Sequence, residues 1–399
     1  MATVELEGLT KRYGKKTAID GVTLSIGDGE FFVILGPSGA GKTTTLKSVA
    51  GLVDVDAGEV SIAGRRVTDV EPYHRNVAMA FESYALYPQR TVFQNLASPL
   101  RSGRTGKYSQ KEQEQRIELV TTTLGINHLL KRFPRELSNG QRQRTALGRV
   151  LVRPADVYLL DEPLSHLDAK LRAAMRAELK HLGEMSNTTS PYVTHDYQEA
   201  LALGHRIAVL REGHVVQVGS PEDVFMRPLD SFVAKALGQP EINLLEGVVD
   251  DGRIVAADGA VAFPVPSAEV SPAADKFTRG SQVRVGIRPR DIQIAPTERR
   301  AGDWLAMHGT VRLAERLGRA IELDVHVGDS EIIAVDSSEH APHEGDPVEI
   351  GLPLHLVHLF AAGPSGEDTA WLGTAVPPLP SQSRTSVEAR KAGVEERQP

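Results

Sequence analysis

The chain of 399 residues contains no cysteine. Disulfide bonds, thiolate nucleophiles and cysteine-ligated zinc sites are therefore excluded, and the lack of disulfides is compatible with a reducing cytosol. Long hydrophobic runs are also missing, because no apolar stretch approaches the ~18 residues that a membrane-spanning helix needs. The first residues lack the basic and apolar regions of a signal peptide. We expect any role at a membrane to depend on a partner.

Positive charge is not in excess either. The formal net charge of −7 argues against general nucleic-acid binding, which normally needs a basic face. Aromatic residues make up only 5% of the chain, so the cluster Ser83-Tyr84-Ala85-Leu86-Tyr87-Pro88 stands out. By itself such a cluster suggests a buried loop that packs on its own domain, although apolar and aromatic anchors also suit helix-in-groove binding. The length favours about two or three domains.

A phosphate-binding loop is the strongest pattern that is present. Residues 36–44 fit G-x-x-x-x-G-K-[ST] and follow the apolar run 31–35, which predicts a buried strand. Glycines let successive N–H groups point at an anion, and a helix that starts near Lys42 adds its N-terminal amides. The alternative is a plain glycine-rich turn. The predicted nucleotide-binding residues here are Gly36, Pro37, Ser38, Gly39, Ala40, Gly41, Lys42, Thr43 and Thr44.

Three patterns further along the chain have both a structural and a functional interpretation. Residues 157–162 form an apolar run that ends in two carboxylates, which by themselves suit a solvated strand exit. Residues 138–141 fit the capping box S-x-x-Q at a helix start. His195 follows a β-like run, and Asp196 with Glu199 predicts a helix cap. A lone histidine in such a place is usually structural or exposed.

In order and spacing these segments resemble those of ABC-transporter ATPases, over roughly residues 1 to 235. Leu137-Ser138-Asn139-Gly140-Gln141 is similar to the LSGGQ signature, and residues 157–162 resemble the Walker B strand. Ser165-His166-Leu167-Asp168 looks like the D-loop, and Thr194-His195-Asp196 looks like the switch histidine. Tyr13 stands in the place of the aromatic residue that stacks on adenine.

The resemblance implies roles in ATP hydrolysis. Lys42 would bind the β- and γ-phosphates, while Thr43 and Asp161 would hold Mg²⁺. Glu162 would orient or deprotonate the attacking water, and His195 would contact the γ-phosphate. Phosphoryl transfer needs mostly positioning and charge stabilisation, which these groups can supply.

The resemblance also implies a pair of chains. In ABC ATPases the signature grips ATP that the phosphate loop of the opposite subunit holds, and this chain has one phosphate loop and one signature. Two chains, as a homodimer or a heterodimer, would therefore form two composite sites. The implied signature and D-loop contacts are Ser138, Asn139, Gly140, Gln141, Ser165, Leu167 and Asp168.

Two residues depart from the family pattern. Asn139 replaces the first glycine of the signature. If Ser138 is the cap, position 139 is already helical, and a positive φ is not required there. Glu82 stands where the family normally has a glutamine that touches Mg²⁺ and water. Glutamate is a hard oxygen ligand suited to Mg²⁺, but it adds a negative charge near the γ-phosphate.

Partners follow from the same resemblance. Tyr84, Ala85, Leu86 and Tyr87 would contact a short helix of one of two transmembrane permease subunits. An extracytoplasmic solute-binding protein would act indirectly, and no nucleic acid is expected. The chain would then lie peripherally on the cytoplasmic face of the cell membrane, with ATP and Mg²⁺ as cofactors.

The sequence pattern changes after Gly238-Gln239-Pro240, where short alternating strands separated by Gly and Pro turns predict a small antiparallel barrel. Segments such as Gly286-Ile287-Arg288-Pro289 resemble the OB/TOBE-like accessory domain of maltose- and glycerol-phosphate-importer ATPases. The expected fold is α/β, a P-loop ABC ATPase domain followed by this β domain. The predicted ranges are 1–237 for the ATPase domain, 88–153 for its helical subdomain, 238–374 for the accessory domain and 375–399 for a disordered tail.

The predicted function is the ATPase subunit of an ABC importer of a carbohydrate or a glycerol-phosphate-like solute. Within transport, export or import of polyamine, iron or sulfate stays an alternative. A P-loop kinase has no reason for the LSNGQ segment. A non-transport ABC protein that works on nucleic acid or ribosomes typically has a coiled coil, a second cassette or basic surfaces, none of which is visible.

Overall fold

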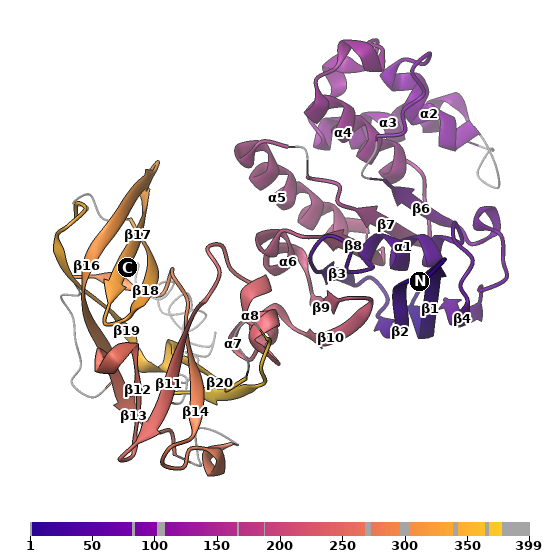
Figure 1. Ribbon diagram of the computed structural model, residues 1–399. Coiled ribbons are helices and arrows are strands. Elements are labelled where there is room, and N and C mark those ends of the chain that lie inside the picture. The colour runs from indigo at the N-terminus through magenta and orange to yellow at the C-terminus, as the bar shows by residue number, and fades with distance from the viewer. Residues whose placement is uncertain are drawn as a thin grey trace, which may run out of the picture. The chain divides into compact units, whose positions relative to one another are not determined.

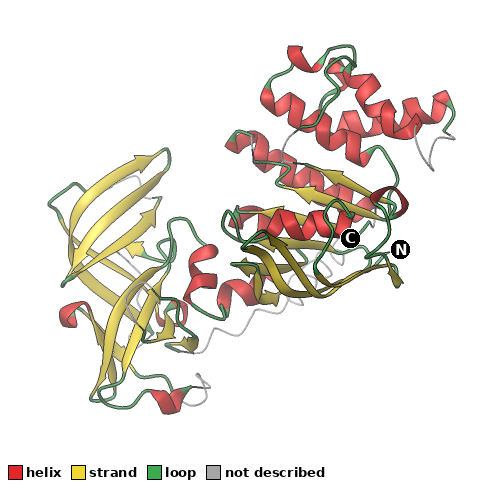
Figure 2. Ribbon diagram, turned by 45° about the vertical axis from the view of Figure 1, so that its right-hand side comes forward, coloured by secondary structure: helices red, strands yellow, loops and turns green. Residues whose placement is uncertain are grey.

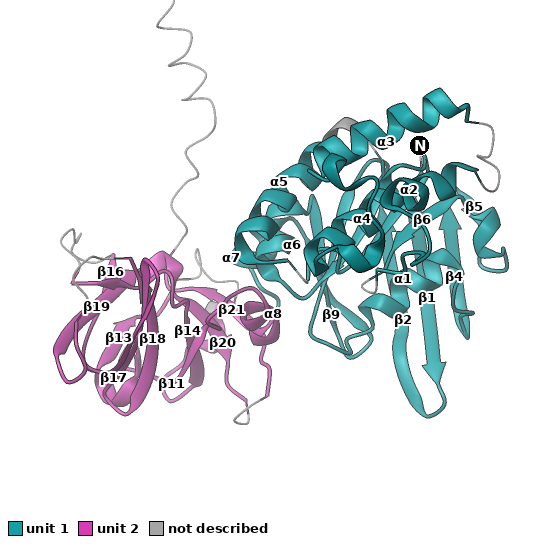
Figure 3. Cartoon of the chain, turned by 90° about the horizontal axis from the view of Figure 1, so that it is seen from above, with its two compact units in different colours: residues 1–229 teal, residues 230–399 magenta. Residues whose placement is uncertain are grey.

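The computed structural model describes residues 2–81, 84–101, 108–165, 167–186, 188–267, 273–295, 303–337, 342–363 and 367–376, without the side chains of 182–186 and 274. The chain divides into two compact units, residues 1–229 and residues 230–399 (Figure 3). Figure 2 shows helices and strands in the first unit and mainly strands in the second. In the described part of the chain, no helix is long and apolar enough to cross a membrane.

A six-stranded sheet forms the centre of the first unit, in the order β10-β9-β3-β8-β7-β6. Its strands are β3 (Phe31–Leu35), β6 (Val77–Ala80), β7 (Val157–Asp161), β8 (Ser190–Thr194), β9 (Arg206–Arg211) and β10 (His214–Gly219). All neighbours are parallel except β10, which is antiparallel to β9. Every residue of β3, β7 and β8 is buried, as expected of strands covered on both faces. The predicted α/β class is confirmed.

A second sheet of the first unit is antiparallel, in the order β2-β1-β4-β5. Its strands are β1 (Val4–Tyr13), β2 (Lys16–Ile26), β4 (Ala57–Ile62) and β5 (Arg65–Arg66). Residues 60–67 have a β-like composition throughout, but the chain turns back after Ile62. Ala63 and Gly64 both have positive φ, which is the backbone of a tight hairpin turn. Apolar residues of both sheets and of α1 share one core.

The helices of the first unit fall into two sets. One set packs on the parallel sheet or near it: α1 (Lys42–Ala50), α5 (Ala169–Ser186), α6 (Tyr197–Leu203) and α7 (Pro221–Met226). The other set is the predicted helical segment: α2 (Val92–Arg101), α3 (Gln110–Thr123) and α4 (Asn139–Leu151), which pack on one another (Figure 1). Short 3-10 turns are η1 (Pro72–His74), η3 (Asn127–Leu129) and η4 (Pro134–Glu136).

The second unit consists of two antiparallel sheets around one apolar core. The six-stranded sheet contains β11 (Asn243–Asp250), β12 (Arg253–Ala256), β13 (Val261–Pro264), β14 (Gln282–Ile287), β20 (His358–Ala361) and β21 (Trp371–Thr374). The five-stranded sheet contains β15 (Gln293–Ile294), β16 (Trp304–Leu317), β17 (Ala320–Val327), β18 (Ser330–Asp336) and β19 (Pro347–Pro353). Its 3-10 turns are η5 (Ala257–Gly259), η6 (Ala274–Lys276) and η7 (Leu354–Leu356). The predicted antiparallel β domain is present.

The second unit begins eight residues earlier than the predicted range of 238–374, because helix α8 (Ser231–Ala236) belongs to it. The backbone N–H of Ser231 donates to the carbonyl of Thr369, at 2.9 Å. The Arg288 guanidinium donates to the carbonyls of Ala234 and Leu237, both at 3.2 Å. These contacts join residues far apart in the sequence, so local pattern could not reveal them. The tail predicted from residue 375 lies, beyond Val376, outside the described residues.

Candidate functional site

A cavity of about 510 Å³ lies where three neighbouring strands of the parallel sheet, β3, β8 and β7, end. Ligands in open α/β sheets bind at the carboxyl ends of the strands. The cavity is lined by Tyr13, Lys16, Ala18, Ser38, Gly39, Gly41, Lys42, Thr43, Thr44, Glu162 and His195. It therefore brings together the predicted phosphate loop, the predicted base, the predicted switch histidine and the predicted aromatic.

The phosphate loop depends on its glycines in two ways. Gly39 and Gly41 have φ of 83° and 103°, which side chains rarely tolerate. Gly36 is required for lack of space, because a Cβ there would lie 2.5 Å from the Leu210 carbonyl oxygen. A Cβ on Gly41 would also lie 2.4 Å from the carbonyl oxygen of Ala18. Helix α1 then begins at Lys42, as predicted, so its first amides face the loop.

Lys42, Glu162 and His195 form a chain of contacts at this cavity. The Lys42 ammonium, only 5% exposed, donates to the carbonyls of Gly36 and Pro37 at 2.9 and 3.0 Å. It also lies 3.6 Å from one carboxylate oxygen of Glu162. The other Glu162 oxygen lies 2.9 Å from His195 Nδ1. An ionised carboxylate can only accept, so this contact requires the proton on Nδ1.

Glu162 follows β7 directly, and its backbone has a φ of 45°. For a residue other than glycine this left-handed conformation is strained, and such strain clusters at functional sites. The backbone N–H of Glu162 donates to the carbonyl of Val193 in β8, at 3.0 Å. Its carbonyl accepts the Ser165 hydroxyl, at 3.0 Å. These two contacts hold the residue in the conformation that directs its carboxylate to the cavity.

Thr43 and Asp161 are brought together as predicted. The Thr43 hydroxyl donates to a carboxylate oxygen of Asp161 at 2.8 Å, and Asp161 is 3% exposed. Among the described residues no cluster of three His, Asp or Glu side chains could hold a metal alone. Mg²⁺ usually takes one or two protein oxygens, with phosphates and water as its other ligands. The Thr43–Asp161 pair fits that requirement.

The signature residues start helix α4 and do not line the cavity. Ser138 is the N-cap: its hydroxyl accepts the N–H of Gln141 at 3.3 Å, and the Gln141 side chain accepts the N–H of Ser138 at 3.0 Å. Asn139 is the first helical residue and lacks a positive φ, as predicted for a helix capped at Ser138. A helix start is a place where anions bind, but the contact of this one with a nucleotide stays a prediction.

The D-loop residues lie between β7 and α5. Asp168 accepts the backbone N–H of Leu171 on its side chain, at 2.9 Å, and so caps α5. Leu167 lies against the signature, because a Cβ on Gly140 would be 3.2 Å from its Cδ2 atom. Nothing here places a partner chain against these residues, so their dimer contacts stay a prediction.

Residues 84–87 are half-buried or exposed, with Tyr87 47% exposed. Asn95 holds this segment, since its side chain accepts the Tyr87 N–H and donates to the Tyr87 carbonyl. The guanidinium groups of Arg90 and Arg149 lie 4.7 and 5.5 Å from the Tyr87 ring centre. The segment is thus presented on the surface of the first unit. Its contact with a membrane partner stays a prediction.

Two residues of the cavity were missed by the sequence reasoning. Lys16 and Ala18 lie on β2, and Lys16 pairs with Tyr13 across the β1–β2 hairpin. The signal was available, because Tyr13 and Lys16 flank the turn at Gly14. Lys16 adds a second positive charge to an anion site. The predicted metal ligand Glu82 lies outside the described residues.

The arrangement of the cavity defines a nucleotide triphosphatase of the phosphate-loop class. Residues 19–165 match the ABC transporter family model, and residues 285–360 match that of the TOBE domain. With the relatives described next, which match over most of its length, the chain belongs to the family of ABC transporter ATP-binding proteins.

Three curated relatives span 90% of this chain and 98% of their own length. The chain is 41% identical to the trehalose/maltose import ATP-binding protein MalK of Thermococcus litoralis. It is 40% identical to the oligosaccharides import ATP-binding protein MsmX of Bacillus subtilis. It is 42% identical to the sn-glycerol-3-phosphate import ATP-binding protein UgpC of Pectobacterium atrosepticum.

Two solved structures are similar to a little over half of this chain, which is about the length of the first unit. A dimeric bacterial ABC transporter cassette is similar with a TM-score of 0.51 and 31% identity, over 55% of this chain and 98% of that one. A second solved structure, of an ATP-binding cassette in a post-hydrolysis state bound to ADP and Pi, matches with a TM-score of 0.51 and 30% identity. The similarity supports ATP as the nucleotide of this fold.

Proposed function

We propose that the chain is the ATPase subunit of an ABC importer of a carbohydrate or a glycerol-phosphate-like solute. The ATPase activity is supported by one observation: Lys42 contacts Glu162, and Glu162 contacts His195, within one cavity. The solute class is supported by the names of the relatives, all of which are import proteins for sugars or glycerol phosphate.

In this proposal each side chain that lines or adjoins the cavity has a defined task. Lys42 attracts the β- and γ-phosphates, and Tyr13 stacks on adenine. The Thr43–Asp161 pair holds Mg²⁺, which supplies charge neutralisation when bound. Glu162 accepts a proton from water as the water oxygen bonds to the γ-phosphorus and the bond to the β-phosphate oxygen breaks. His195 contacts the γ-phosphate and fixes the Glu162 carboxylate, to which it lies 2.9 Å away.

The proposed assembly is a pair of such chains with two transmembrane permease subunits, on the cytoplasmic face of the membrane. The helix start at Ser138, Asn139, Gly140 and Gln141 faces the nucleotide of the second chain. Self-pairing is preferred, because Lys42, Glu162 and His195 are all present in one cavity. The segment 84–87 receives a helix of the permease, and Glu82 is a further metal-side ligand.

The test is solute uptake in cells that lack the gene for this chain and retain the membrane subunits. The full chain should restore uptake of one carbohydrate or glycerol phosphate, and Lys42→Ala should not. The complex should also be purified through a tag on a membrane subunit, with this chain detected in it. Restored uptake of a polyamine, iron or sulfate would overturn the solute class. Absence from the complex would overturn the transport role.

Pairing has its own measurement. Glu162→Gln should bind ATP without hydrolysing it and should accumulate as a dimer in light scattering. Lys42→Ala is the matched control, because it removes the phosphate contact and should remain monomeric. A Glu162→Gln protein that stays monomeric with ATP, but pairs with another ATPase from its own operon, would favour a heterodimer.

A further inference from the structure

We propose that Arg172 is a positioning residue for ATP hydrolysis, which holds the D-loop and the switch segment together and thereby fixes Glu162 against His195. The switch segment is Thr194, His195 and Asp196. The inference rests on the ATPase function proposed above. Arg172 itself does not line the cavity, so it acts through the residues that it holds.

Arg172 lies in the first turn of α5, directly after the D-loop. Its backbone N–H donates to the carbonyl of Asp168 at 2.8 Å. Since the Asp168 side chain also caps this helix, the start of α5 is fixed to the end of the D-loop. The position of the Arg172 side chain is therefore set by the loop that it contacts.

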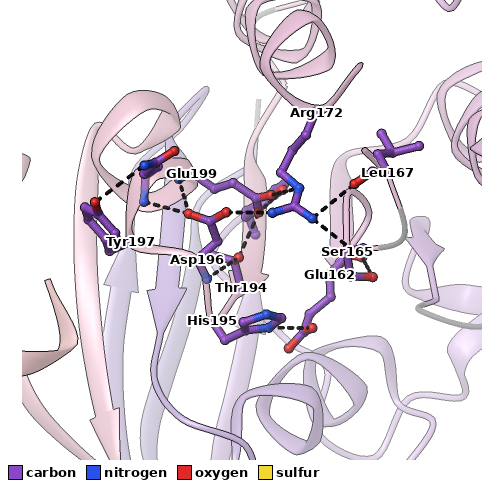
Figure 4. A network of polar contacts seen from close by, with 11 residues as sticks. Glu162, Ser165, Leu167, Arg172, Thr194, His195, Asp196, Tyr197 and Glu199 are labelled. Carbon is purple, nitrogen blue, oxygen red and sulfur yellow. Dashed lines mark hydrogen bonds and ion pairs between the residues drawn. The ribbon is translucent and has the colours of Figure 1, made fainter. Parts of the chain in front are cut away.

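The Arg172 guanidinium bridges two separate segments (Figure 4). Its Nη2 donates to the carbonyl oxygens of Leu167 and Ser165, at 3.1 and 3.4 Å. Its Nη1 donates to Asp196 Oδ2 at 3.2 Å. A planar guanidinium presents several donors in fixed directions, so it can hold acceptors from two segments at once.

Asp196 divides its carboxylate between two tasks. Oδ1 accepts the backbone N–H groups of Gln198 and Glu199, at 2.8 and 3.3 Å, and so caps helix α6. Oδ2 faces Arg172. His195 directly precedes Asp196 and directly follows strand β8. The hydrogen bond from Arg172 to Asp196 therefore fixes the backbone position of the histidine.

The contacts close into a ring. Glu162 accepts the Ser165 hydroxyl on its carbonyl, Ser165 accepts Arg172, Arg172 binds Asp196, and His195 returns to the Glu162 carboxylate. Figure 4 shows these residues converging from the two loops. Loss of Arg172 opens the ring at a point away from the residues that line the cavity. Glu162 then keeps its contacts with Lys42 and Ser165, but the side-chain bridge from the D-loop to the switch segment that carries His195 is lost.

A second carboxylate at the start of α6, that of Glu199, also lies near Arg172. Glu199 is 2% exposed, and one of its oxygens accepts the Tyr192 and Thr194 hydroxyls at 2.8 and 2.7 Å. Its other oxygen lies 4.0 Å from Arg172 Nε. Burial raises the pKa of Glu199. Arg172 thus faces both carboxylates of the α6 start, but its hydrogen bond to this segment is the one to Asp196.

The test compares four variants of the full chain in its transporter complex: Arg172→Gln, Arg172→Lys, Asp196→Asn and the double variant Arg172→Gln/Asp196→Asn. Steady-state ATPase rates give kcat and KM, calorimetry gives ATP affinity, and thermal unfolding gives Tm. Arg176→Gln is the matched control, because it removes the same charge one turn further along α5.

Arg172→Gln should lower kcat by ~10- to 10²-fold, the scale of a small misplacement of catalytic groups, with KM and ATP affinity changed less than ~3-fold. Arg172→Lys should be intermediate, since an ammonium cannot hold both segments in the same geometry. Asp196→Asn leaves one acceptor oxygen where the carboxylate has two. That oxygen can accept either the backbone N–H groups that begin α6 or the Arg172 guanidinium, so capping of α6 is kept only if the Arg172 contact is lost. The double variant should be no slower than the worse single variant, because both act on one contact.

An Arg172→Gln protein with kcat within ~2-fold of the unchanged chain would overturn the inference. Multiplying losses in the double variant would do so as well, since they would show independent effects. If Arg172→Gln does not fold, Arg172→Lys and Asp196→Asn provide the same comparison. An unchanged chain that binds ATP but never hydrolyses it would overturn the proposed function instead.

Discussion

The two units each contain a hollow of similar size but of different chemistry. The hollow of the first unit, about 510 Å³, is lined by the phosphate loop, two lysines, a glutamate and a histidine. The hollow of the second unit, about 580 Å³, is lined by carboxylates such as Glu246, Asp258 and Asp329 and by small residues, without a lysine, arginine or histidine. The two hollows thus differ more in the charges that line them than in volume, since only the first brings lysines and a carboxylate together.

Strand direction explains this difference. In the first unit β3, β7 and β8 are parallel and neighbouring, so the residues that follow them meet at one edge. In the second unit every described strand pairing is antiparallel, and consecutive strands end at opposite edges. Alternating side chains there fill the core on one face and meet solvent on the other. The described strands of the second unit therefore do not bring the residues that follow them to one edge.

The largest effect should come from removing the carboxylate that we propose as the base in the first hollow. Glu162→Gln should lower kcat by ~10² or more, because the amide cannot accept the proton of water. ATP binding should be kept, since Lys42 and the loop amides remain. Steady-state ATPase rates in the transporter complex and calorimetry measure the two properties. Glu222→Gln, a carboxylate exposed on α7, is the control; near-normal turnover of Glu162→Gln would refute the base assignment.

Removing the second unit tests whether it holds two ATPase units together. A chain ending at Leu229 should bind ATP normally, but its specific activity should fall several-fold on ~10-fold dilution, because a permanent contact maintains a high local concentration of the partner. The full chain should change less than ~2-fold. Activity against protein concentration is the measurement. Identical concentration dependence of the two proteins would favour a purely regulatory second unit.

The position of the cut sharpens that experiment. A chain ending at Leu237 keeps α8 but loses the strands on which it packs, so Val233 and Ala234, both 0% exposed in the full chain, would face water. We expect this protein to aggregate more readily than the one ending at Leu229. Light scattering of the two proteins at equal concentration makes the comparison.

A buried histidine should make the second unit sensitive to acid. Burial, with the nearby Arg288, lowers the pKa of His358 from 6.5 to about 3. The unfolded chain therefore takes up a proton that the folded chain refuses, and stability present above pH ~6.5 is lost as the pH falls toward 3. Between pH 7 and 5 the loss is about 2 kcal/mol.

Denaturant unfolding of the full chain at several pH values, followed by Trp304 and Trp371 in the second unit, measures this loss. His358→Gln should flatten the dependence between pH 7 and 5, and His308→Gln, an exposed histidine of β16, should not. Equal pH dependence in the unchanged chain and in His358→Gln would show that His358 is not its source.

The smallest effect is expected at the departure in the signature. Asn139 is already helical, so Asn139→Gly relieves no strain and costs less than about 1 kcal/mol of stability. ATPase activity should stay within ~3-fold. Ser138→Ala, which removes the cap, should cost about 1 kcal/mol and serves as the comparison. A tenfold rise in the rate of Asn139→Gly would show instead that the asparagine side chain crowds the nucleotide.

Local sequence patterns predicted most secondary-structure elements around the cavity of the first unit. The apolar run 31–35, the loop glycines and the start of α1 at Lys42 were predicted, because short-range chemistry determines them. The capping box at Ser138 followed from residue spacing alone. The hairpin at Ala63 was missed, since a β-like composition continues through the turn.

Contacts between distant segments could not be predicted. The Lys16 contribution to the cavity, the packing of α8 through Arg288, and the Arg172 bridge all join residues whose separation in sequence has no regular period. From sequence alone, an arginine in a helix is predicted to be exposed to solvent, because the acceptors of its guanidinium lie on segments distant in the sequence. The membrane surface at 84–87 and the ligand role of Glu82 remain predictions from resemblance.

The contact between Leu167 and Gly140 has a consequence for movement. Within one chain, the loop that follows Glu162 lies against Gly140 of the signature, because a Cβ on that glycine would be 3.2 Å from Leu167 Cδ2. In the proposed pair, a movement of that loop during hydrolysis would push on the surface gripping the neighbour's nucleotide. In that pair the loop after Glu162 and the signature could not shift independently, because Leu167 and Gly140 leave no free space between them.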